Sequence, residues 1–156
     1  MNLKENLSCK QELRFSMDGT FKILMLSDIQ ETLEYDARSL RDMDALIERE
    51  QPDLVLLGGD ICNGLVLKTA QELSDYLDIF TAPMEKRGIP WAHVFGNHDH
   101  DIPVDAVEKT LLYERYPHCV SKHTTGMHGT TNYMLPVKAS AGDQIAFAVW
   151  GMDTGN

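Results

Sequence analysis

The sequence predicts an α/β protein built on a mostly parallel sheet with flanking helices. Short apolar runs typical of buried strands alternate with longer stretches in which apolar residues recur every three or four positions. This alternation favours parallel strands joined by helical crossovers, which places layers of helix on the sheet. The chain has 156 residues, 43% of them apolar and 24% charged, which is the size and composition of one globular domain.

The first expected elements are strand-like runs at 13–15 and 21–26. An Asp18-Gly19 pair lies between them, and an Asp-Gly pair between two such runs predicts a β-hairpin. The second run is nearly all apolar, which predicts a strand covered on both faces.

A helix is expected next, over 39–50, followed by a short buried strand at 54–57. Ser39 with Asp42 three positions later resembles a capping box at the start of this helix. Its apolar residues fall on one helical face, namely Leu40, Met43, Leu46 and Ile47.

A longer helix is expected over 66–84, and Pro83 should end or kink it because proline has no N–H to donate. A third strand at 91–95 and a further helix at 104–116 follow. Residues 122–131 are rich in Thr, Gly and His and indicate a loop. Strands at 132–137 and 144–152 complete the chain, joined by a turn at 140–143.

Polar clusters follow each of the three strands that precede or separate the helices. Asp28 follows the first strand, Asp60 the second, and the run Asn97-His98-Asp99 the third. Loops beyond the carboxyl ends of parallel strands converge on one crevice, so these side chains should meet in space. Carboxylate, amide and imidazole donors together suit Mn²⁺, Fe or Zn²⁺.

In order and spacing, the segments Asp28-Ile29-Gln30, Gly58-Gly59-Asp60 and Gly96-Asn97-His98-Asp99 resemble the calcineurin-like metallophosphoesterase family. The family pattern is D-x-H, then G-D, then G-N-H-[DE], each after a strand. The resemblance extends over 21–156, and the segments 91–99, 129–137 and 152–156 are most similar to its purple-acid-phosphatase-related branch. It implies a four-layer αββα sandwich, of which residues 1–156 form the N-terminal part of a single domain without its C-terminal part.

The resemblance also implies roles for individual residues. Asp28 would bind the first of two divalent metal ions and Asp60 would bridge both, while Asn97 would bind the second. His98 would lie beside the phosphate of a phosphomonoester or phosphodiester and act as a catalytic residue. Asp99 would be catalytic by holding the His98 imidazole in its useful tautomer. The two ions, Mn, Fe or Zn, would activate water for attack on phosphorus.

Two departures from the family pattern matter. Gln30 stands where the family has the His of D-x-H, and a carboxamide oxygen is a weaker donor than imidazole toward Zn²⁺ or Fe. The family's later His ligands and G-H-x-H motif do not occur in residues 1–156. We therefore expect at most one weakly bound metal here, a missing second sheet, and self-association through an exposed apolar face. The alternative function is a catalytically inactive scaffold or binding module on the same fold.

Other interpretations of these residues stay open. Asp28 and Asp60 could cap the helices that follow them. His98 could be an ordinary loop histidine, and His100 and Asp101 are expected in a solvated loop. The remaining imidazole and thiol groups are expected to be structural, since His93 lies within an apolar strand and the others fit no standard zinc spacing: His118, Cys119, His123 and His128.

Charge and cysteine content narrow the class of partners and the compartment. With 24 Asp and Glu against 14 Lys and Arg, the net charge is −10, which disfavours binding to nucleic acid. No run reaches the roughly 20 apolar residues of a membrane span, so no membrane partner is expected. The odd count of Cys9, Cys62 and Cys119 suits reduced thiols, and we expect a cytoplasmic protein.

Overall fold

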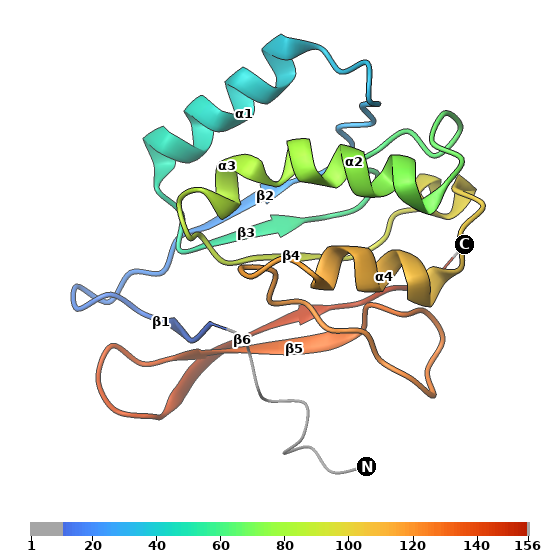
Figure 1. Cartoon of the computed structure of the whole chain (residues 1–156). Helices are drawn as coiled ribbons and strands as arrows, with labels where there is room; N and C mark the ends of the chain where they lie inside the picture. The colour runs from blue at the N-terminus through green and yellow to red at the C-terminus, as the bar shows by residue number, and fades with distance from the viewer. Residues whose placement is uncertain (1–10, 156) are drawn as a thin grey trace.

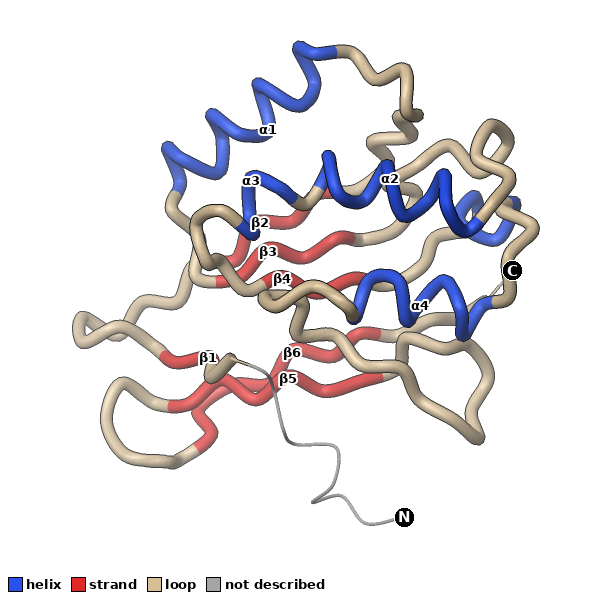
Figure 2. The backbone as a smooth tube through the Cα atoms, in the orientation of Figure 1, coloured by secondary structure: helices blue, strands red, loops and turns tan. Residues whose placement is uncertain are grey.

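The computed structural model describes residues 11–155 and has the predicted α/β class (Figure 1). Two three-stranded sheets lie face to face, and the helices cover the outer face of one of them. Figure 2 shows the strands as two separate groups, with α1, α2 and α3 on the side of β2, β3 and β4 that faces away from the other group. The expected alternation of strand and helix is confirmed for the first sheet.

The first sheet contains β2 (Ile23–Leu26), β3 (Leu54–Leu57) and β4 (Trp91–His93), in the order β2-β3-β4. All neighbours are parallel. Their carboxyl ends therefore lie at the same edge of the sheet, and the chain leaves each strand into a loop at that edge. This places the three predicted polar clusters side by side.

Strand β2 lies at the edge of this sheet and is not covered on both faces as its sequence predicts. Leu24 and Leu26 pack against the core beneath the helices, whereas Ile23 and Met25 are 37% and 65% exposed. In β3, by contrast, three of the four residues are fully buried, as expected of the central strand. A run of apolar residues predicts a strand but does not reveal whether a neighbour covers it.

Helices α1 (Ala37–Glu50) and α2 (Ala70–Phe80) begin at different residues from those predicted. Asp36 caps α1 by accepting from the N–H of Arg38, so the proposed box of Ser39 with Asp42 is wrong. Helix α2 has a true capping box between Thr69 and Glu72 and so starts four residues later than expected.

The remaining helices agree more closely with the sequence. Pro83 begins the one-turn helix α3 (Ala82–Glu85) after α2 has ended, which confirms the predicted break. Helix α4 (Ala106–Glu114) is capped by Asp105, which accepts from two backbone N–H groups. Buried side chains between the helices and the first sheet form the larger core, among them Ile47, Leu57, Leu73, Leu77, Phe80, Trp91 and Tyr113.

The second sheet contains β1 (Leu13–Arg14), β5 (Tyr133–Lys138) and β6 (Ile145–Gly151), in the order β1-β5-β6. The hairpin of β5 and β6 is antiparallel as predicted, and β1 joins β5 in parallel. The expectation that a second sheet would be missing is therefore wrong. A smaller core between the two sheets includes Leu13, Leu54, Ala92, Val120, Leu135 and Val137.

The predicted hairpin between the first two strands is also wrong. A tight turn does form, with the Gly19 N–H donating to the Ser16 carbonyl at 2.9 Å. However, β1 and β2 on its two sides belong to different sheets, so this turn carries the chain from one sheet to the other.

Several apolar side chains on the two sheets face solvent in the described part of the chain. Met25 of β2 and Phe147 and Trp150 of β6 are 65%, 51% and 68% exposed. Cys62 and Cys119 are buried, while Cys9 lies outside the described residues. Within residues 11–155, none of the helices combines the length and apolar character needed to cross a membrane.

Candidate metal centre

Three loops meet at the carboxyl edge of the first sheet, after β2, β3 and β4. The Asp28 N–H donates to the Gly59 carbonyl at 3.1 Å and the Gln30 N–H donates to the Asp60 carbonyl at 3.0 Å. The loop after β4 joins them through the His98 N–H, which donates to Asp60 Oδ1 at 2.8 Å. The predicted site residues are thus tied together by their own backbones.

The backbone at this edge adopts the left-handed region, which L residues other than glycine rarely occupy. Asp28, Gln30 and Asp60 have φ of 57°, 51° and 53°. Such conformations cost of order 1–3 kcal/mol each, and they cluster at functional sites, where they are part of the mechanism. The other non-glycine residue with positive φ in the described chain, Gln51, ends helix α1.

Gly96 and Gly59 allow the loops to approach at atomic distance. A Cβ on Gly59 would lie 2.3 Å from the Gly96 nitrogen, and one on Gly96 would lie 2.4 Å from Asp60 Oδ1. Neither position can carry a side chain without moving the loop beside it. Both glycines are therefore required by the contact between the loops.

The donor groups at this edge fit a hard divalent cation. Asp60 is buried, with 7% of its surface exposed, whereas Asp28, Gln30 and Asn97 are open to solvent. Together they offer two carboxylates and two carboxamides, the oxygen donors typical of Mg²⁺ and Mn²⁺ sites. Within 11–155, no group of three or more His, Cys, Asp or Glu residues suited to a metal occurs.

The alternative role of Asp28 and Asp60 as helix caps is excluded. Helix α1 is capped by Asp36 and helix α2 by Thr69, each several residues after the candidate metal ligand. The Asp60 carboxylate instead accepts from the His98 backbone, and the Asp28 carboxylate accepts from the Ser27 hydroxyl at 2.7 Å. Neither carboxylate has a cationic side chain as an ion-pair partner in the described chain.

Asp99 does not contact the His98 imidazole as predicted. It is 2% exposed, and its Oδ2 accepts from the Asp60 N–H at 2.7 Å and the Gly96 N–H at 2.8 Å. Burial raises the pKa of Asp99, and these two N–H bonds partly offset that rise. Asp99 therefore braces the loop after β3 against the loop after β4, which places it beneath the site.

The His98 ring is held by Asp101 instead. Nδ1 of His98 lies 2.8 Å from Asp101 Oδ2 within the single 3-10 turn His98–Asp101. This hydrogen bond is the main reason that the pKa of His98 is raised above its usual value. The His98 side chain is 45% exposed, so the ring is open to a ligand, and Asp101 is not merely a residue of a solvated loop.

Lys109 lies beneath this turn, and its burial was not predicted from the sequence. This lysine is 2% exposed, and its Nζ donates to the Asp99 carbonyl at 2.7 Å beside the Phe95 ring. Burial lowers the pKa of Lys109. The only sequence signal for this burial is that Lys109 falls on the inner face of helix α4. The apolar residues of α4 recur too irregularly for that face to be identified from the sequence.

Asp153 lies two residues after the end of β6, and the sequence did not single it out as a buried carboxylate. Its carboxylate is buried and accepts from the N–H groups of Thr130 and Gly155 at 2.7 and 3.0 Å. Burial works to raise the pKa of Asp153, but these backbone bonds outweigh it and the pKa is lowered. His100 Nε2 lies 3.9 Å from Asp153 Oδ1, which places the late loop beside the turn that carries His98.

Three of the other histidines form hydrogen bonds with side chains away from this site. His93 is buried, bonded through Nδ1 to the Ser121 hydroxyl and stacked on Tyr113, and burial lowers its pKa to about 3. His118 pairs with Gln11 and His123 with Glu114.

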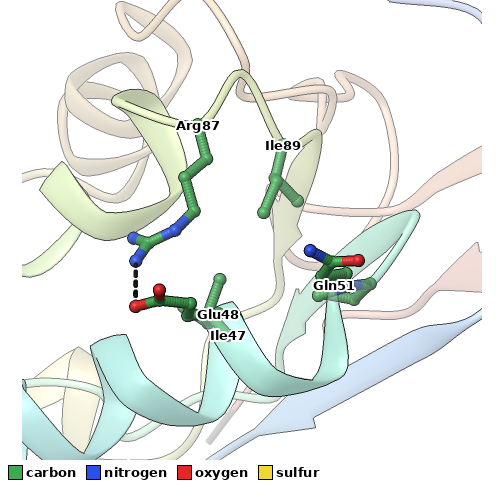
Figure 3. A pocket seen from close by; sticks show the side chains of 6 residues that line it. Ile47, Glu48, Gln51, Arg87 and Ile89 are labelled. Carbon is green, nitrogen blue, oxygen red and sulfur yellow. Dashed lines mark hydrogen bonds and ion pairs between the residues drawn. The ribbon is translucent and has the colours of Figure 1, made fainter.

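A surface pocket of about 370 Å³ lies at the opposite edge of the sheet, before β3 and β4 (Figure 3). Arg87 forms ion pairs with Asp44 and Glu48 at its rim. Its lining is Ile47, Glu48, Gln51, Pro52, Arg87 and Ile89. This pocket is separate from the candidate metal centre.

A family model for calcineurin-like phosphoesterases matches residues 21–145. The chain therefore belongs to the calcineurin-like phosphoesterase family, as its motifs predict. Among curated proteins, it is 29% identical to "Probable inactive purple acid phosphatase 28" of Arabidopsis thaliana, over 92% of this chain and 44% of that protein. "Probable inactive purple acid phosphatase 14" of the same plant is 27% identical, over 88% of this chain and 39% of that protein.

A third relative is "Phosphatase DCR2" of Saccharomyces cerevisiae, 29% identical over 75% of this chain and 24% of that protein. The similarity to the purple-acid-phosphatase branch is thus confirmed. The chain spans less than half the length of these curated relatives.

Proposed function

We propose that this chain supplies part of the active site of a metal-dependent phosphoesterase that hydrolyses a phosphomonoester or phosphodiester at a dinuclear centre. The observation that carries the proposal is the convergence of Asp28, Asp60 and the Asn97-His98 turn at one sheet edge. The left-handed backbone at Asp28 and Asp60 supports it, because such strain persists where function requires it.

Asp28 and Asp60 would bind the metal ions through carboxylate oxygens, with Asn97 and Gln30 adding amide oxygens. When bound, the ions would lower the pKa of a coordinated water and polarise the phosphoryl oxygens. The protein's own part is to fix these donors on braced loops and to present His98. Its half-exposed imidazole can donate a hydrogen bond or a proton to an oxygen of the substrate.

Gln30 supports a second candidate, an inactive scaffold or binding module. A neutral amide oxygen replaces the imidazole of the family pattern, which weakens the first metal position toward Zn²⁺ and Fe. Two relatives carry the words "probable inactive" in their names, while another is named a phosphatase. The oxygen-only donor set still suits Mn²⁺, and for this reason we place the enzyme first.

The discriminating experiment uses the intact protein. Bound metal is measured by atomic emission, and hydrolysis of p-nitrophenyl phosphate and bis-p-nitrophenyl phosphate is followed with added Mn²⁺. We expect two ions and turnover that His98→Ala reduces by about 10²-fold or more. A metal-free protein that gains activity only as Gln30→His would establish the scaffold. Residues 1–156 alone should hold at most one weakly bound ion and show negligible turnover.

The proposal also covers partners and compartment. A phosphoester is the expected ligand, and the net charge of −10 argues against nucleic acid. Exposed Met25, Phe147 and Trp150 support self-association through the sheets. The buried free thiol of Cys62 supports a cytoplasmic location. We propose no membrane partner.

A further inference from the structure

The contact between His98 and Asp101 lies within one turn of 3-10 helix. In this conformation residues three apart lie on the same side of the backbone, whereas residue i+1 points elsewhere. Asp101 is three residues after His98, and its Oδ2 reaches Nδ1 of the ring at 2.8 Å. The adjacent Asp99 points beneath the loop, where both of its N–H partners lie.

This turn is fixed on the side of the metal ligands. The His98 N–H donates to Asp60 Oδ1 at 2.8 Å, and Lys109 Nζ donates to the Asp99 carbonyl at 2.7 Å. Gly64 packs against the His98 carbonyl so closely that a Cβ there would lie 2.1 Å from its oxygen.

The far end of the turn is fixed as well, because Ile102, which follows Asp101, is 2% exposed and belongs to the core. The His98–Asp101 hydrogen bond therefore joins two side chains whose backbones are both held in place. Because both backbones are held in place, this hydrogen bond can determine the orientation of the His98 ring.

We propose that Asp101 is the positioning residue of His98, holding the ring by Nδ1–H so that Nε2 is the nitrogen offered to a ligand. No protein partner of Nε2 is observed in the described chain, and the side chain is 45% exposed. A carboxylate behind a histidine fixes its tautomer and ring direction. The role of this pair in a reaction rests on the proposed function. The tautomer of His98 does not depend on that function.

In the reaction, the protonated ring would keep Nδ1–H on Asp101 and give the Nε2 proton to the leaving oxygen as the P–O bond breaks. Water supplies the new P–O bond and releases its proton to solvent, and His98 is left neutral with its proton on Nδ1. Substrates with a poor leaving group need this proton most. Loss of Asp101 should therefore slow the hydrolysis of alkyl phosphates more than the hydrolysis of p-nitrophenyl phosphate.

The first test reads the tautomer without any reaction. In metal-free intact protein with ¹⁵N-labelled histidine, at one pH where the ring is neutral, long-range ¹H–¹⁵N correlation shows which nitrogen carries the proton. We expect Nδ1–H for His98 in the wild type and in Asp105→Asn, a matched change that removes no His98 contact. In Asp101→Ala the proton should move to Nε2. A wild-type Nε2–H ring, or an unchanged ring in Asp101→Ala, overturns the proposal.

The second test compares substrates. For Asp101→Ala and Asp101→Asn, kcat on an alkyl phosphate should fall at least about 10-fold more than kcat on p-nitrophenyl phosphate, with KM changed by no more than about twofold. Equal losses on both substrates would overturn the catalytic part of the inference. If the intact wild type hydrolyses neither substrate, the proposed function fails, while the tautomer result still decides the role of Asp101. Circular dichroism confirms that both variants are folded.

Discussion

The brace formed by Asp99 predicts a large and local loss of stability when its carboxylate is removed. Asp99→Ala would leave the buried N–H of Asp60 and the partly buried N–H of Gly96 without their acceptor, because Oδ2 serves both. An unsatisfied buried donor costs about 1–3 kcal/mol, so two should cost about 2–6 kcal/mol. This is a large part of the 5–15 kcal/mol by which a typical domain is stable.

Asp99→Asn should cost much less. The carboxamide oxygen can take the place of Oδ2 and accept from both N–H groups, while its NH₂ faces the sulfur of Cys62, 3.7 Å from Oδ1. Replacing a charged acceptor by a neutral one lowers the worth of each bond, for a total of about 1–2 kcal/mol. Comparing the loss of stability in Asp99→Ala with that in Asp99→Asn therefore separates the effect of the hydrogen bonds from the effect of the lost side-chain volume.

The assay is urea unfolding of the metal-free intact protein, combined with amide hydrogen exchange. Asp42→Ala is the control, because its side chain is 75% exposed and it should change the free energy of unfolding by less than about 0.5 kcal/mol. In Asp99→Ala, exchange at the Asp60 and Gly96 amides should accelerate more than exchange in β3. A loss no larger than that of Asp42→Ala would refute the brace.

Three further predictions follow from single contacts. Gly96→Ala would place a Cβ 2.4 Å from Asp60 Oδ1 and should weaken Mn²⁺ binding at least about 10-fold by calorimetry, whereas Gly142→Ala, with open space around it, should not. Burial lowers the pKa of His93 to about 3, so the native state binds fewer protons than the unfolded state between pH 6.5 and 3. Stability should therefore fall by about 1.4 kcal/mol per pH unit below 6.5, and thermal unfolding of His93→Phe should lack this slope. The Arg87 guanidinium lowers the pKa of Asp44 to about 2, so its stabilisation is present above pH 4 and lost as the pH falls toward 2. Because this pair is partly exposed, Asp44→Asn should remove about 1 kcal/mol or less, measured as the difference in urea unfolding between pH 6 and pH 2.

The strands and helices of the first sheet were predictable because local burial determines them. The run 54–57 is covered on both faces in the centre of the sheet, and its composition shows it. The exposed face of β2 was not predictable, since it depends on which strand lies beside it. The pairing of β1 with β5 was not predictable either, because Leu13 and its partner Val137 are separated by most of the sequence. Contacts at that separation are chosen by the whole fold and leave no local pattern.

At the site, sequence identified the donors but not their supports. Asp28, Asp60 and Asn97 stand after strands whose carboxyl ends must meet, so topology alone brought them together. The ring-holding role that the sequence predicts for Asp99 belongs to Asp101, which the sequence places only in a solvated loop, because adjacency in sequence does not bring the Asp99 carboxylate to the His98 ring. In a helical turn the residue three positions on is the neighbour, and the run His98–Asp101 has that conformation.

The contacts that support the loops of the candidate metal centre are all present, and they bear on how catalytic activity would be lost. The strained backbone of Asp28 and Asp60, the Asp99 brace and the Asp101 contact are all in place. A protein that only retained the fold would have no need to keep left-handed aspartates, each costing of order 1–3 kcal/mol. Within the three segments that match the family pattern, the one departure is the side chain of Gln30. If the intact protein lacks turnover, restoring the imidazole by Gln30→His should therefore suffice to recover metal binding, without any repair of the loops around it.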